Sequence, residues 1–121
     1  MTPRLQAERR RFVRVPFDRP ARAERIPQSF QNDVFDLLAA DLSEGGARLS
    51  SPEFFPLASL LVLDLDPPPP FRTVGRIVWS EQLAHGQRWR VGVEFAELSG
   101  EARSRLRKIV RQRQLARLRR L

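Results

Sequence analysis

The sequence predicts a small, mainly β protein: an antiparallel barrel covered by one C-terminal helix. Three observations support this fold class. The chain has 121 residues, which suits one domain with a real core. Short runs rich in β-branched and aromatic residues recur from Phe12 to Leu98, separated by prolines and glycines. After Leu98 the apolar residues recur at every third or fourth position, which is typical of a helix.

The first expected strand begins with FVRVPF, residues 12–17. Pro16 favours an edge or a first-strand position, because proline cannot donate to a β-ladder. A looser stretch, 18–33, contains two further prolines and is expected to hold part of a strand around 22–26.

The middle of the chain predicts three more strands. VFDLLAADLS (34–43) runs into the turn SEGG, where we expect the paired glycines to supply positive φ angles. ARLSS (47–51) then continues in the extended conformation. LASLLVLDLD (57–66) alternates near its end, and the proline run at 67–70 terminates it.

The clearest strands are RTVGRIVWSE (72–81) and QRWRVGVEFAEL (87–98), which the short connection between them predicts to be an antiparallel hairpin. In the second strand, alternate residues fall on one face: Trp89, Val91, Val93 and Phe95. In total the pattern gives six or seven short strands before the helix.

The helix begins after Ser99, a good N-cap residue, and Glu101 complements the dipole in the first turn. An apolar stripe should dock on the sheet; it comprises Leu98, Ala102, Leu106, Ile109 and Val110. Beyond Gln112 the leucines drift to other faces, so this end either projects or meets a partner. Leu115, Leu118 and Leu121 therefore permit a homodimer.

The net charge of +8 is localised. Residues 1–100 contain equal numbers of arginines and acids, whereas residues 101–121 contain nine basic residues and one acid. A second, local basic cluster lies at residues 4–14. The charge therefore belongs to the C-terminal helix and not to the body of the domain.

Catalysis finds little support in the composition. The chain has no cysteine, no tyrosine and one histidine, His85, which we expect in a solvated hairpin turn. It contains no metal-ligand cluster and no phosphate-binding glycine loop, so we expect no enzyme, no metal and no cofactor. There is neither an apolar run of membrane-spanning length nor an apolar leader, so we expect a cytoplasmic protein without a membrane span.

Two motifs have to be considered together. Arg10 and Arg14 form an RxxxR pattern, and some thirty residues later Asp41, Ser43 and Gly46 form DxSxxG. With GVEF (92–95) in a late strand and a closing helix, this set resembles the PilZ domain. The resemblance covers residues 8–111, leaving 1–7 as a flexible N-terminal arm and 112–121 as the basic end of the helix.

The resemblance implies a bacterial receptor for cyclic di-GMP on a six-stranded β-barrel. It implies that Arg10, Arg14, Asp41, Ser43 and Gly46 contact the ligand. In relatives a basic residue just before RxxxR accompanies a stacked pair of ligands, so Arg9 implies two molecules per protomer. Further candidates are Arg11, Gly45 and Arg48, the last of which faces either the ligand or solvent.

The chemistry of these residue types agrees with such a ligand. A guanidinium pairs phosphate oxygens and reads the O6/N7 edge of guanine bidentately. Asp41 would accept hydrogen bonds from guanine N1 and N2, and Ser43 would supply a hydroxyl. Gly46 would permit the turn and a close approach of the backbone.

The main hypothesis is a single-domain effector. The arginine arm repels itself when free and is clamped by the anionic dinucleotide, so that the surface presented to a downstream partner protein changes. One alternative is nucleic-acid or anionic-membrane binding through the basic helix, although nucleic acid is the less expected partner. Another is a PilZ-like adaptor without a ligand.

Several residues also have a simpler explanation. The arginines before the first strand can be a solvated arm, and Asp41, Ser43 and Gly46 can be a turn that bonds its own backbone. Trp79 and Trp89 either pack on the barrel or border the ligand.

Overall fold

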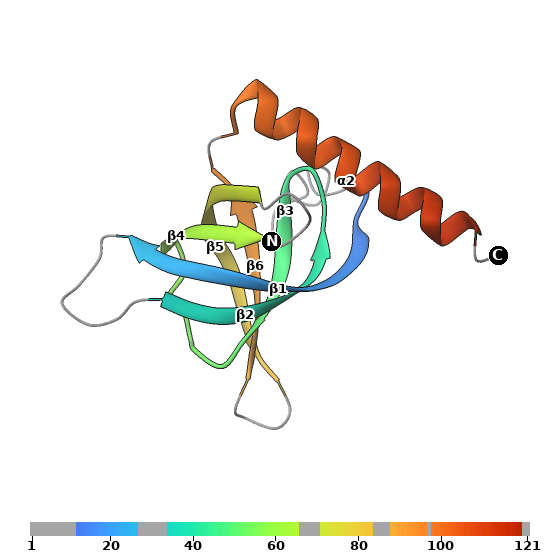
Figure 1. Ribbon diagram of the computed structural model, residues 1–121. Coiled ribbons are helices and arrows are strands. Elements are labelled where there is room, and N and C mark those ends of the chain that lie inside the picture. Colours follow the sequence, from blue (N-terminus) through green and yellow to red (C-terminus); the bar gives the residue numbers. More distant parts are fainter. Residues whose placement is uncertain (1–11, 27–33, 66–70, 84–87, 97, 120–121) are drawn as a thin grey trace, which may run out of the picture.

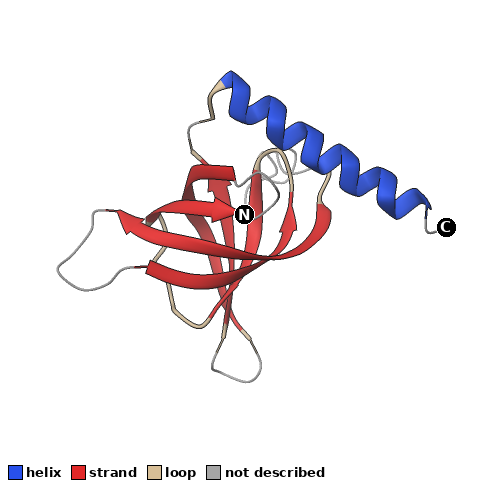
Figure 2. Ribbon diagram, viewed as in Figure 1, coloured by secondary structure: helices blue, strands red, loops and turns tan. Residues whose placement is uncertain are grey.

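The computed structural model describes residues 12–26, 34–65, 71–83, 88–96 and 98–119. Within these residues six strands form one closed antiparallel barrel in the order β1-β2-β3-β6-β5-β4, and one helix lies across an end of it (Figure 1, Figure 2). The predicted fold class is confirmed. The elements are β1 Val15–Ile26, β2 Val34–Leu42, β3 Gly46–Ser51, β4 Leu60–Leu65, β5 Phe71–Gln82, β6 Trp89–Phe95 and α2 Gly100–Arg119.

Alternating side chains fill the barrel. The predicted inward face of β6 is confirmed, since Val91, Val93 and Phe95 are buried and Trp89 packs partly buried against the core. Burial of one such aliphatic or aromatic side chain contributes about 1.5–3 kcal/mol. The largest fully buried side chains are Phe17, Phe55, Phe71, Leu42, Leu49, Leu61, Leu63, Leu65, Ile77, Leu106, Val15 and Val91.

The first strand is longer than the sequence predicts. β1 runs without interruption through both Pro16 and Pro20, although the prediction ended one strand at residue 17 and began another near 22. The ladder explains this difference. β1 pairs with β2 from Val15 onward, but with β4 only from Ala21 onward, so both prolines lie where one side of the strand has no strand partner among the described residues. The predicted edge position of Pro16 is correct.

The turn between β2 and β3 corrects the expectation for its glycines. Neither Gly45 nor Gly46 adopts a positive φ. A Cβ on Gly46 would instead collide with the carbonyl oxygen of Val93 in β6, and one on Gly45 would lie 2.8 Å from the ring of Phe12. The glycines are therefore required by close approach and not by backbone conformation.

Helix α2 docks as the apolar stripe predicts. Ser99 Oγ accepts a hydrogen bond from the backbone N–H of Ala102 at 3.1 Å, which confirms the predicted N-cap. Leu106 and Val110 are buried, and three further stripe residues pack partly buried against the core. In Figure 1 the C-terminal half of α2 lies on the side of the barrel where β1 begins. There the guanidinium of Arg113 lies 5.0 Å from the ring centroid of Phe17.

Candidate functional site

Two neighbouring register shifts shape one patch of the barrel's outer face. The β1–β2 pairing shifts between Pro16 and Arg19, and the β2–β3 pairing shifts between Ala39 and Asp41. Asp18, inside the first shift, has a φ of 50°, which aspartate tolerates better than most residues. Such bulges bend a strand locally and redirect its side chains.

The shift in β2 decides the direction of Asp41. Leu37 and Ala39 are buried in the barrel, so strict alternation would also point residue 41 inward. The extra residue, Ala40, reverses the alternation, so that Leu42 is fully buried and Asp41 pairs with Arg48 on the outer face. A strand of uninterrupted period two would bury this carboxylate among apolar side chains.

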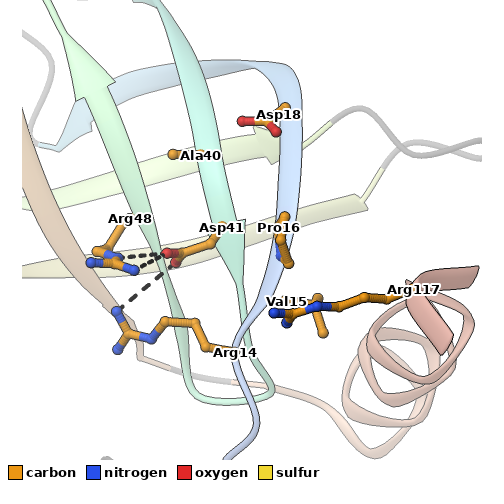
Figure 3. A pocket seen from close by; sticks show the side chains of 8 residues that line it. All are labelled: Arg14, Val15, Pro16, Asp18, Ala40, Asp41, Arg48 and Arg117. Carbon is orange, nitrogen blue, oxygen red and sulfur yellow. Dashed lines mark hydrogen bonds and ion pairs between the residues drawn. The ribbon is translucent and has the colours of Figure 1, made fainter. Parts of the chain in front are cut away.

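An open pocket of about 360 Å³ lies over this patch (Figure 3). β1, β2 and β3 supply most of its walls, and the last turns of α2 supply one side chain. Its lining consists of Arg14, Val15, Pro16, Asp18, Ala40, Asp41, Arg48 and Arg117.

The carboxylate of Asp41 lies between two arginines. Arg48 donates from both Nε and Nη2 to Oδ2, each at 2.5 Å, and Nη1 of Arg14 lies 3.9 Å from Oδ1 (Figure 3). The Asp41 side chain is 12% exposed, whereas those of Arg14 and Arg48 are 40% and 38% exposed. Oδ1 is buried and accepts no hydrogen bond from the described residues. The cluster thus combines a spare acceptor with guanidinium donors that face solvent.

A row of paired residues extends this site around the barrel. Pro16 is paired with Asp41, Asp41 with Arg48, Arg48 with Gly92, and Gly92 with Trp79. The indole of Trp79 covers Gly92, where a Cβ would collide with it. The sequence left the role of this tryptophan open; the register shift in β5 between Ile77 and Trp79 places it on the outer face.

The other residues of the second motif have local roles in the turn. Ser43 is buried, and its Oγ accepts hydrogen bonds from the N–H groups of Gly45 and Gly46, both at 3.1 Å. Glu44, which lies between Ser43 and Gly45 in the sequence, pairs with Arg107 of α2 at 2.9 Å. The turn is thereby stabilised internally and tied to the helix.

The structure brings three of the predicted site residues together at the pocket, while Ser43, Gly45 and Gly46 do not line it. Arg14, Asp41 and the secondary candidate Arg48 converge on the pocket, and the Ser43–Gly46 turn lies at the end of the same hairpin. Arg9, Arg10 and Arg11 lie outside the described residues. The prediction missed the wall formed by Pro16, Asp18, Ala40 and Arg117, because these residues meet only through the register shifts and the docking of α2.

In the described part of the chain, no group of three or more histidine, cysteine or acidic side chains is placed to hold a metal ion. No described helix combines the length and apolarity that crossing a membrane requires.

The profile of the PilZ domain matches residues 8–112, most of the chain. The protein belongs to the PilZ domain family. The predicted resemblance is thereby confirmed. Among curated proteins no relative matches this chain.

Solved structures share the fold of this PilZ protein at low sequence identity. The PilZ domain with c-di-GMP of YcgR from Escherichia coli is 13% identical, with a TM-score of 0.69, and 93% of this chain covers 96% of that domain. The Bacillus subtilis inhibitor of motility, MotI/DgrA, is 15% identical with a TM-score of 0.72; 87% of this chain covers 51% of it. Apo MrkH from K. pneumonia is 16% identical with a TM-score of 0.69; 90% of this chain covers 52% of it. The chain thus spans about half the length of MotI/DgrA and MrkH.

Proposed function

We propose that this PilZ protein is a receptor for cyclic di-GMP. The observation that carries the proposal is the placement of Arg14, Asp41 and Arg48 on the walls of one pocket, with Oδ1 of the carboxylate buried and without a hydrogen-bond donor among the described residues. The similar PilZ domain of E. coli YcgR, which is described with c-di-GMP, supports the choice of ligand. The pocket volume lies within the range of small-molecule sites.

The guanidinium groups match the phosphates of the ligand, and the carboxylate matches its guanines. The exposed guanidinium of Arg14 offers donors to a phosphate, with the two-pronged geometry that lysine lacks. Oδ1 of Asp41 is covered by its neighbours, and it would accept from a guanine N–H when Arg14 turns from it to a phosphate, while Oδ2 keeps its bonds to Arg48. In this arrangement Arg48 orients the carboxylate, and Trp79 offers an aromatic surface further along the row.

The proposed response is an ordering of the arginine segment over the pocket. Arg10 and Arg11 precede β1 in the sequence, and the first residue of β1, Val15, lines the pocket. Neutralisation of these arginines by the bound phosphates removes their mutual repulsion and lets the segment close over the ligand. The altered surface then signals to a downstream protein, without catalysis and in the cytoplasm.

Isothermal titration calorimetry with cyclic di-GMP tests this proposal. We expect the intact protein to bind, and Arg14→Ala and Arg10→Ala to abolish measurable binding. Arg22→Ala is the matched control, because Arg22 lies further along the chain, on β1, where it pairs with Asp36 and does not line the pocket. Absence of binding by the intact protein, or equal binding by Arg14→Ala, would refute the receptor function and favour a ligand-free adaptor.

The same titration counts ligands. We propose two molecules per protomer, with Arg9 supporting the second through its position directly before the RxxxR motif. Arg9→Ala should then reduce the stoichiometry from two to one while binding persists. A stoichiometry of one for the intact protein would contradict this part of the proposal alone.

A second candidate function is binding of a polyanion, either nucleic acid or an anionic surface, through α2. Its motivation is the exposed basic face of the helix, which includes Arg103, Lys108, Arg111 and Arg119. Retention on duplex DNA and on anionic vesicles at two salt concentrations tests it, since binding driven by phosphates weakens steeply with salt. Lys108→Ser with Arg111→Ser should remove such retention and leave cyclic di-GMP binding unchanged.

A further inference from the structure

Helix α2 contributes a wall to the pocket. Arg117, near the end of the helix, lines the pocket together with Arg14, Asp41 and Arg48. Figure 3 shows its side chain extending from the helix towards Val15, on the side of the pocket away from Arg48. Arg117 belongs to neither motif and lies beyond residue 112, where the match to the PilZ profile ends. Nothing in the family pattern therefore assigns it a role.

The docking of the helix fixes where Arg117 lies. Val110 is buried against the core, and Arg113 lies over the ring of Phe17, which is itself buried in β1. Arg117 follows Arg113 by four residues, so the two side chains lie on the same face, one turn apart. The cation–π contact of Arg113 helps to hold the last turns of the helix beside the start of β1. Packing of the helix against the barrel thus fixes the position of Arg117.

The charges around the pocket leave Arg117 with unused hydrogen-bonding capacity. Of the two carboxylates on the walls, Asp41 is already engaged by Arg48 and faces Arg14. Among the described residues, Arg117 forms no ion pair with a carboxylate, and its side chain is exposed. The three arginines of the lining outnumber its two aspartates, Asp18 and Asp41, so the walls carry a net charge of +1. The site therefore suits an anionic group placed at Arg117.

We propose that Arg117 binds a phosphate group of the ligand, so that α2 is part of the nucleotide site. This inference rests on the proposed receptor function and adds to it a contact outside the motifs. It divides the site into two parts: Asp41 and Arg48 hold a guanine edge, and Arg14 and Arg117 hold phosphate from β1 and α2. The ligand then bridges the barrel and the helix, and the docked helix strengthens binding.

Calorimetric titration of cyclic di-GMP into Arg117→Gln and Arg119→Gln tests the inference. The two substitutions remove the same charge from the same turn of α2, but Arg119 does not line the pocket. We expect Arg117→Gln to weaken binding by roughly tenfold to a hundredfold, as the loss of a hydrogen bond to a charged group does. Arg119→Gln should change the affinity less than twofold. Arg117→Lys should recover part of the loss, because it keeps the charge without the fork.

The outcomes separate this inference from the receptor function. If the intact protein binds and Arg117→Gln binds equally well, the inference is overturned and the receptor stands. If Arg119→Gln loses as much affinity as Arg117→Gln, the effect is the general charge of the helix, and the specific contact is refuted. If the intact protein does not bind, the receptor function itself fails. Thermal unfolding of both variants should match the intact protein, because both side chains are exposed.

Discussion

Arg48 and Asp41 face each other across the β2–β3 hairpin, and the Nε and Nη2 atoms of the arginine converge on one carboxylate oxygen, Oδ2. The other oxygen is left on the side of Arg14. In the proposed receptor, this geometry would orient the carboxylate before the ligand arrives and so reduce the entropic cost of binding.

The pair should be energetically coupled in the free protein. A double-mutant cycle of Asp41→Ala and Arg48→Ala, followed by urea unfolding, should give about 1–2 kcal/mol, since the carboxylate is largely buried. Asp64 and Arg72 form the matched control. They are a cross-strand pair on β4 and β5 with the same chemistry, but the aspartate is 38% exposed. Their coupling should stay below about 0.5 kcal/mol. Equal coupling in the two pairs would contradict a special role of burial at the site.

Gly46 should be intolerant of any side chain even without ligand. Gly46→Ala forces a methyl group onto the backbone carbonyl of Val93, which cannot move without disturbing the β3–β6 ladder. We expect a loss of roughly 1–3 kcal/mol in the free energy of unfolding, as for overpacking. Gly45→Ala should cost less, because the neighbouring atoms belong to the Phe12 side chain, which can rotate. Denaturant titration of the two variants measures this difference; an equal loss would argue against the backbone contact.

Trp79 should report ligand binding by fluorescence. It lies on the outer face, in the row that contains Asp41 and Arg48, so a bound base changes its surroundings. Trp89 lies at the start of β6 and stacks against Phe54, with ring centroids 4.9 Å apart. Titration with cyclic di-GMP should therefore change the emission of Trp89→Phe and leave that of Trp79→Phe nearly constant. The reverse pattern would place the ligand elsewhere.

The docking of α2 should depend on its buried residues and not on its exposed leucines. Leu106→Ala removes a fully buried side chain and should lower the free energy of unfolding by about 2–5 kcal/mol. Leu118 is 63% exposed, so Leu118→Ala should change the free energy of unfolding by less than about 0.5 kcal/mol. Urea unfolding followed by circular dichroism provides the comparison. A large effect at Leu118 in dilute protein would indicate a contact between copies of the chain.

The sequence predicted the elements well because periodicity records which face of a strand is buried. The hairpin of β5 and β6, the N-cap at Ser99 and the apolar stripe of α2 all depend on local spacing, and each is confirmed. The boundaries of β1 were wrong because the tolerance of Pro16 and Pro20 depends on which strands lie beside them.

The site was predicted only in part, for a related reason. Composition and motif order indicate Arg14 and Asp41, and the pocket confirms that these residues lie together. The direction of Asp41 and the wall formed by Arg117 depend on two register shifts and on helix docking, which arise between elements distant in sequence. The positive φ expected for Gly46 was wrong, and the sequence did not show the close approach because the atom that excludes a side chain belongs to β6, nearly fifty residues away.

The extra residue in β2 has a genetic consequence. Ala40 is the residue that the register shift accommodates and lines the pocket with a single methyl group, so other small side chains should serve there. Its deletion would leave regular alternation, with Ala39 inward, Asp41 outward and Leu42 inward, so the carboxylate would keep its direction. Substitutions by small residues at this position and deletion of its single codon should therefore both survive in a mutational library.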